Sequence, residues 1–264
     1  MEATKRKVRP WVWLLIAAVL LFGLLGAKRA WYAWLDISFY WTERTEAELA
    51  VKAYAEEQGI SIGEYPRSLI ELLERNPETK DFVLGYPFRQ NQEKDSMHFE
   101  NPEVLPLFLQ WDPCWGYEKY GSDFLAVTGC GPTCLAMAGF YLTGSENMSP
   151  GQIADFAEKN GYYESGFGSS WTLISEGAGK LGLTATELPL VKKKIINALE
   201  EGCPVILAMG AGDFTTTGHY IVLTGVESGA FRVNDPNSLL NSEKLWTYEQ
   251  LENQIRNIWA IDRA

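Results

Sequence analysis

Apolar residues form one long uninterrupted run near the N-terminus. From Trp11 to Ala27 the sequence reads WVWLLIAAVLLFGLLGA and holds no charged residue. At about 1.5 Å of rise per residue, a helix of this length extends roughly 26 Å, slightly less than a bilayer core. Lys28 and Arg29 can extend their side chains to the interface, where the flanking aromatic residues are also favoured. A helix packed in the core of a globular domain usually has a polar face, and this run has none. The pattern predicts a transmembrane helix.

The charges around this run predict its orientation. Four basic residues lie in the ten residues before it and only two follow it directly, so the positive-inside rule places the N-terminus in the cytoplasm and the remaining chain outside. A cleaved signal peptide is the alternative, and it usually ends in an A-x-A-like site. Leu25 stands two residues before Ala27, and Lys28 two before Ala30, so neither position fits. We therefore favour a retained anchor in residues 1–30.

Residues 31–104 show a helical pattern without a chemical motif. An aromatic-rich stretch, 31–41, predicts a juxtamembrane connector. Residues 42–59 predict an amphipathic helix ended by Gly59, and PRSLIELLERNP predicts another that begins with a proline. PETKDFVLGYP predicts a short third helix that stops at Tyr86-Pro87. We interpret this region as a packing subdomain or stalk.

Residues 105–264 predict helices first and strands afterwards. Four helical segments are expected, at 129–144, 149–161, 171–182 and 191–202, with Ser149 capping the second and Ser169 or Ser170 the third. Two apolar runs then predict strands at 204–209 and 219–226, and a turn at 227–230 leads to a return strand at 231–234. The last segment predicts a helix followed by a short strand. This order indicates an α+β fold with an antiparallel sheet.

The charge distribution bears on the partners of the chain. The formal net charge is −11, but the first 29 residues hold six of the 23 basic residues and one of the 34 acidic residues. The rest therefore carries 17 basic and 33 acidic residues, a net charge of −16. Such a surface repels anionic polymers, so we do not expect a nucleic-acid partner.

Cys130 lies in a setting that suits a nucleophile. Glycines flank it and Pro132 follows, which predicts a sharp turn into a helix with Cys130 at its N-terminus. The helix dipole and the unpaired N–H groups there favour a thiolate and can help to form an oxyanion hole. Cys134, one turn later, is interpreted as a small buried apolar residue. Taken alone, a cysteine at a Gly-Pro turn is more often structural.

His219 and Asp235 stand where a base and its orienting acid would be needed. The chain has only two histidines, and His219 opens an apolar strand after the polar loop DFTTTG. Asp235 ends the strand that follows the hairpin turn. If these strands pair, the start of the first meets the end of the second, and the two side chains reach the same edge. In isolation, His219 could be a surface residue, and Asp235 could belong to an ordinary turn. Together with Cys130 they suggest a Cys-His-Asp triad.

Several stretches resemble the C39-like peptidase family, a bacterial branch of the papain-like cysteine peptidase fold. The resemblance covers about Tyr65 to Ile261 and rests on NPETKDFVLGYP, QWDPCWGY, GCGPTCLAMAGFYLTG, GDFTTTGHYIVLTG and VNDPNS. It implies a Cys130-His219-Asp235 triad in a peptidase domain at 105–264. It also implies a glutamine before the nucleophile that donates to the oxyanion hole. Gln110 is our candidate, although it lies 20 residues before Cys130 and could instead be a surface residue.

The expected chemistry is amide hydrolysis by acyl transfer, which needs no metal or organic cofactor. Cys130, Cys134 and His219 lack a fourth ligand at a spacing typical of zinc sites. The expected partner is an extracellular peptide or cell-wall peptide. An aromatic cleft made by Trp115, Tyr117, Phe167 and Trp171 is one expectation, against simple packing roles. A catalytically inactive domain that binds peptides, or a structural adaptor working through residues 42–100, are the alternatives.

Overall fold

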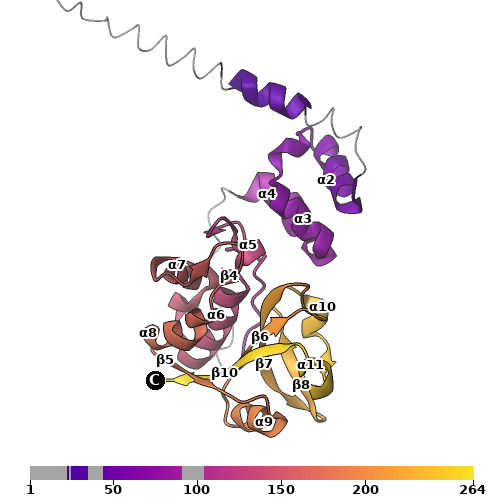
Figure 1. Ribbon diagram of the computed structural model, residues 1–264. Coiled ribbons are helices and arrows are strands. Elements are labelled where there is room, and N and C mark those ends of the chain that lie inside the picture. The colour runs from indigo at the N-terminus through magenta and orange to yellow at the C-terminus, as the bar shows by residue number, and fades with distance from the viewer. Residues whose placement is uncertain (1–22, 24, 35–43, 91–103) are drawn as a thin grey trace, which may run out of the picture. The chain divides into compact units, whose positions relative to one another are not determined.

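The computed structural model describes residues 23, 25–34, 44–90 and 104–264 (Figure 1). Contacts divide the chain into unit 1, Met1–Glu74, and unit 2, Arg75–Ala264. The predicted boundary at residue 105 therefore lies inside unit 2. No helix in the described ranges combines the length and apolar character needed to cross a membrane. Most of the predicted span Trp11–Ala27 lies outside those ranges.

Unit 1 consists of short helices. Residues 25–34 are helical, and they are followed by α2 (Glu46–Glu57), the 3₁₀ turn η1 (Ile62–Glu64) and α3 (Arg67–Arg75), whose last residue belongs to unit 2. Thr45 and Glu48 form a reciprocal capping box that satisfies free N–H groups at the start of α2. The buried carboxylate of Glu48 also pairs with Arg67 and so ties α3 to α2.

Helices fill the first half of unit 2. They are η2 (Pro77–Thr79), α4 (Lys80–Arg89), α5 (Leu125–Thr128), α6 (Cys130–Thr143), η3 (Glu146–Met148), α7 (Pro150–Lys159), the π-helical turn η4 (Leu173–Gly177), α8 (Ala178–Lys180) and α9 (Lys192–Glu200). Two short hairpins lie among them, β1 (Lys119–Tyr120) with β2 (Asp123–Phe124) and β3 (Tyr163–Glu164) with β4 (Gly168–Ser169).

A six-stranded antiparallel sheet forms the second half. Its order is β5-β10-β6-β7-β8-β9, with bounds β5 (Leu183–Glu187), β6 (Val205–Gly210), β7 (Gly218–Glu227), β8 (Ala230–Asn234), β9 (Leu245–Trp246) and β10 (Ile255–Arg263). The short helices α10 (Leu239–Ser242) and α11 (Tyr248–Leu251) connect its last strands. The α+β prediction is confirmed as a mixed helix and sheet fold.

The sheet separates two apolar cores, because successive strand residues point to opposite faces. Ile206 and Val222 pack on one face, in a core that includes most of α6. Leu207 and Ile221 pack on the other face, in a core that includes Ile195 of α9. Helix α6 contacts β7 and β10, and α9 contacts β6 and β7 (Figure 1). Helix α6, which begins at Cys130, is thus held directly against the strand that carries His219.

Several predicted elements need correction. Helix α4 continues through Pro87 to Arg89, because a proline in the last turn removes only one backbone hydrogen bond. The helix predicted at 171–182 begins as a π-helical turn after Thr172, and neither Ser169 nor Ser170 caps it. The final helix is only four residues long, whereas the final strand, β10, has nine. The edge strand β5 was not predicted, since LTATE has little apolar periodicity.

Candidate active site

Cys130 is the first residue of α6, as its Gly-Pro context predicts. Gly129 precedes the helix, and the N–H of Thr133 donates to its carbonyl at 3.0 Å. A Cβ added to Gly131 would lie 2.6 Å from Ser169 Oγ, so only glycine allows α6 to approach β4 this closely. The thiol of Cys130 is partly exposed, while Cys134 is fully buried, as predicted. Burial raises the pKa of the Cys134 thiol far above its usual value.

His219, the second residue of β7, lies between Cys130 and Asp235. Its Nε2 is 2.7 Å from Asp235 Oδ1, and the Cys130 side chain is close enough to raise the pKa of the ring. Burial by itself would lower the pKa of His219. The charge of Asp235, its hydrogen bond and the contact with Cys130 outweigh burial and raise the pKa to about 10. The ring is therefore favoured as an imidazolium at neutral pH.

Asp235 follows β8 directly and is almost completely buried. The register of the hairpin pairs Val222 with Asn234, so the start of β7 meets the end of β8, as the sequence predicts. Both carboxylate oxygens accept further hydrogen bonds. Oδ1 accepts the N–H of Asn237 at 2.9 Å, and Oδ2 accepts Asn241 Nδ2 at 2.8 Å. These bonds hold the carboxylate in its position beside the His219 ring.

Gln110 is buried, not a surface residue, and it bridges the two sides of this cluster. Its backbone N–H donates to Pro236 O at 2.7 Å, directly after Asp235. Its side-chain Nε2 donates to Ala126 O at 2.8 Å, in the α5 turn that leads to Cys130. A primary amide has two N–H groups, so one remains for another acceptor. Its Oε1 is buried and has no partner among the described residues.

Comparison of the sequence with family models identifies the family. The family model described as Peptidase_C39 like family matches residues 103–263, more than half of the chain. The chain belongs to this family. Membership indicates a cysteine peptidase, in a family with divergent members.

One solved structure similar to this C39-like chain is the peptidase domain of Streptococcus ComA, a bi-functional ABC transporter involved in a quorum sensing pathway. The two share 22% sequence identity with a TM-score of 0.40, over 52% of this chain and 91% of that one. No curated protein matches the sequence.

Further polar groups, not identified from the sequence, lie near Cys130, His219 and Asp235. Tyr120 Oη lies 2.7 Å from Ser169 Oγ, and Tyr220 Oη donates to Ser169 O at 3.2 Å. Burial raises the pKa of both phenols well above the usual value, and the nearby Cys130 adds to this. Both tyrosines therefore stay neutral beside the thiol. Tyr120 lies in the YEKYGSDF stretch between Gln110 and Cys130, for which the sequence predicts no role.

The four aromatic residues expected at a cleft separate into two groups. Trp115 is buried and donates its indole N–H to Leu109 O at 2.7 Å, and Tyr117 donates its hydroxyl to Phe82 O at 2.7 Å. Both have packing roles. Phe167 is 87% exposed and Trp171 is 49% exposed, and each is two residues away in the sequence from Ser169, which packs against Gly131.

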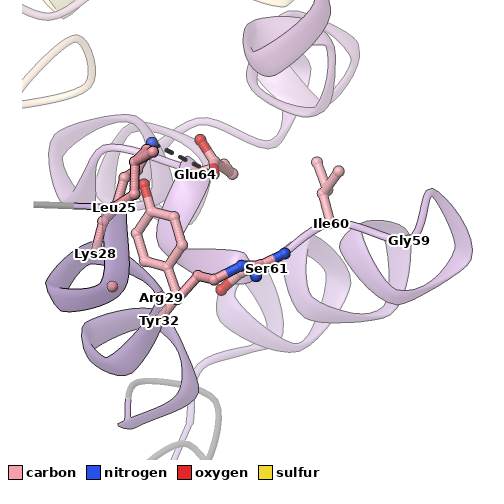
Figure 2. A pocket seen from close by; sticks show the side chains of 9 residues that line it. Leu25, Lys28, Arg29, Tyr32, Gly59, Ile60, Ser61 and Glu64 are labelled. Atoms are coloured by element: carbon pink, nitrogen blue, oxygen red, sulfur yellow. Dashed lines mark ion pairs between the residues drawn. The ribbon is translucent and has the colours of Figure 1, made fainter. Parts of the chain in front are cut away.

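A separate pocket lies within unit 1 (Figure 2). Its volume is about 810 Å³, and Lys28, Arg29, Tyr32 and Glu64 are among the residues that line it. Lys28 Nζ lies 3.7 Å from Glu64 Oε1. No thiol or imidazole is among its lining residues, so the pocket has none of the groups of the Cys130 cluster.

Proposed function

We propose that this chain is a cysteine peptidase, anchored in the membrane by its N-terminal apolar run, that hydrolyses peptide amide bonds through Cys130, His219 and Asp235. The observation that carries the proposal is the position of the His219 ring, 2.7 Å from the Asp235 carboxylate and near enough to Cys130, the first residue of α6, for the thiol to affect its pKa. It brings together three residues that are separated by up to 105 positions in the sequence. This is the arrangement that nucleophilic acyl transfer requires.

In the proposed reaction, the Cys130 thiol first transfers its proton to His219. The sulfur attacks the carbonyl carbon and forms a tetrahedral intermediate. His219 then gives its proton to the departing amine as the C–N bond breaks, which leaves an acyl thioester on Cys130. A water molecule gives a proton to His219 and attacks the thioester. The C–S bond breaks, the acid is released and the thiol is restored.

Asp235 supports this cycle by holding the imidazole in one orientation and by favouring its charged form. The raised pKa of His219 supports the role of its imidazolium as the acid for the leaving amine. The backbone N–H of Cys130 and the second N–H of Gln110 are the proposed donors to the oxyanion. Gln110 suits this role because it is buried and already fixed by Ala126 and Pro236.

The proposed location follows from the charge pattern around Trp11–Ala27, with the cytoplasm on the N-terminal side and the peptidase region outside. The proposed substrates are therefore extracellular peptides or cell-wall peptides. Carbonate extraction of membranes tests the anchor. The full chain should stay in the pellet, and a Leu15→Arg/Leu20→Arg variant should be released.

A digest of a proteome-derived peptide library tests the proposed activity. The wild-type chain should cleave a defined set of peptides, and Cys130→Ala should cleave none of them. Cys134→Ser is the matched control, because it alters a buried thiol one helical turn away and should cost stability more than rate. Identical cleavage by Cys130→Ala and wild type would reject the proposal.

Alkylation by iodoacetamide separates an enzyme from a domain that only binds peptides. Cys130 should react rapidly at neutral pH, and His219→Ala should slow that reaction strongly, because the imidazolium no longer stabilises the negative sulfur. Slow alkylation in wild type, unchanged by His219→Ala, would favour the binding domain.

A further inference from the structure

The loop that carries Asp235 is held by residues from a distant part of the chain. We define the Asp235 loop as Asp235–Ser242, which ends in the short helix α10. Two side chains, one from η2 and one from its N-cap, form hydrogen bonds with this loop, although about 160 residues separate them from it in sequence. They are Asn76 and Glu78, and both belong to unit 2 together with the loop.

Glu78 satisfies the start of α10 with both oxygens. Oε1 accepts the Ser238 hydroxyl at 2.5 Å, and Oε2 accepts the N–H groups of Leu239 at 2.8 Å and of Leu240 at 3.2 Å. The first N–H groups of a helix lack partners within it, so this carboxylate replaces water or a loop contact there. Glu78 therefore fixes the position of the first turn of α10.

Asn76 holds the loop one residue earlier. Its Nδ2 donates to Asn237 O at 2.5 Å, and Trp111 Nε1 donates to the same oxygen at 3.0 Å. Its Oδ1 accepts the N–H of Glu78 at 3.0 Å, so the two side chains are held in one arrangement. Asn76 is also buried, which strengthens these bonds.

The held turn is the one that contacts the Asp235 carboxylate. Asn241, in α10, donates to Asp235 Oδ2 at 2.8 Å. Ser242 Oγ accepts the backbone N–H of Asp235 at 2.9 Å and donates to Ser238 O at 2.8 Å. A displacement of the first turn of α10 would move Asn241 and Ser242, and with them the carboxylate that faces His219.

We propose that Asn76 and Glu78 are positioning residues for the active site: they hold the Asp235 loop so that the carboxylate keeps its contact with His219. This inference rests on the proposed function. Both residues precede the segment 103–263 that matches the family model. Residues that the sequence assigned to a packing or stalk region thus act on the reaction.

The direct test is a titration of His219 by NMR, with labelled histidine in the full chain. The sequence has two histidines, so His98→Gln leaves one resonance to follow. Asp235 and Cys130 are the titratable groups whose effects raise the pKa of His219. Glu78→Ala should loosen the Asp235 contact, so the resonance should titrate at lower pH than in wild type. Glu78→Gln keeps an acceptor and should restore part of the difference.

Turnover is the second readout. Glu78→Ala and Asn76→Ala should lower kcat by about 10- to 100-fold, because a small misplacement of a catalytic group has this effect, and should leave KM nearly unchanged. Ser149→Ala is the matched control: it removes the hydroxyl that caps α7, away from the Asp235 loop. It should cost similar stability and leave both kcat and the titration of His219 as in wild type.

The two readouts separate the possible failures. A His219 titration in Glu78→Ala identical to wild type would overturn the positioning role, whatever the turnover. A shifted titration in a chain that cleaves no peptide and has no His219-dependent alkylation would keep the positioning role and reject the proposed function. An equal loss of kcat in Ser149→Ala would mean that lower stability of the fold, and not the position of the Asp235 loop, causes the loss, and would overturn the inference.

Discussion

Cys130 and Asp235 reach the His219 ring from two regions that are held in different ways. Cys130 is placed by the main chain, through a glycine-flanked helix start and the apolar packing of α6 against the sheet. Asp235 is placed by side chains, through hydrogen bonds with Asn241 and Ser242. Asn76 and Glu78 in turn hold the loop and the helix α10 to which these residues belong. Packed main chain tolerates the loss of one polar group, whereas a buried polar network does not. The Asp235 region should therefore be more sensitive to single polar substitutions.

Substitution of Asp235 should cause the largest loss of kcat. Asp235→Asn removes the charge that favours the imidazolium and turns an amide N–H toward Asn241 Nδ2, which is also a donor. We expect kcat to fall by about 10²- to 10³-fold, within the range for loss of acid–base assistance. Steady-state kinetics on a peptide identified in the library digest measures it. A kcat equal to that of the wild type in Asp235→Asn would contradict the role of the charge.

Gln110 links the Cys130 region and the Asp235 region, because it forms hydrogen bonds with Ala126 and Pro236. Gln110→Ala should lower kcat by about 10²-fold, as removal of one oxyanion donor does. Tyr117→Phe is a suitable control, because it also removes one hydrogen bond to a backbone carbonyl in unit 2. If both variants lose the same small fraction of kcat, Gln110 has only a packing role.

The same contrast explains what could be predicted from the sequence. The helix start at Cys130 and the pairing of His219 with Asp235 follow from local signals, a Gly-Cys-Gly-Pro turn and a hairpin, and the contacts agree with both. The contacts that hold the Asp235 loop could not be predicted from local signals, because Asn76 and Asn237 are 161 positions apart and each alone is typical of a turn. Strand β5 was missed for a related reason, since an edge strand needs little apolar sequence once β10 provides its partner.

Gly131 tests whether main-chain packing does fix the nucleophile. Gly131→Ala would place a Cβ 2.6 Å from Ser169 Oγ and 2.7 Å from Ser169 Cβ, so either α6 or β4 must move. We expect a loss of about 1–3 kcal/mol in the free energy of unfolding, typical of overpacking, measured by urea denaturation. Ser169→Gly in the same chain removes both clashing atoms and should recover part of the loss. A stable Gly131→Ala variant with normal turnover would show that the close approach is unimportant.

The His219–Asp235 pair should also make the free energy of unfolding depend on pH. The pKa of His219 is raised from its ordinary 6.5 to about 10 in the folded chain, so its contribution is complete below pH 6.5 and is lost as the pH rises through 10. In Asp235→Asn only Cys130 still opposes the effect of burial, so the pKa of His219 should fall strongly and most of this alkaline loss should disappear. Between pH 7 and 10 the wild type should therefore lose up to about 1.4 kcal/mol per pH unit relative to Asp235→Asn. Urea midpoints of both variants across this range measure the difference, in which the other titrating groups cancel. Parallel curves would mean that the charge of Asp235 does not stabilise the imidazolium, and would leave the Asp235 region with a purely geometric role.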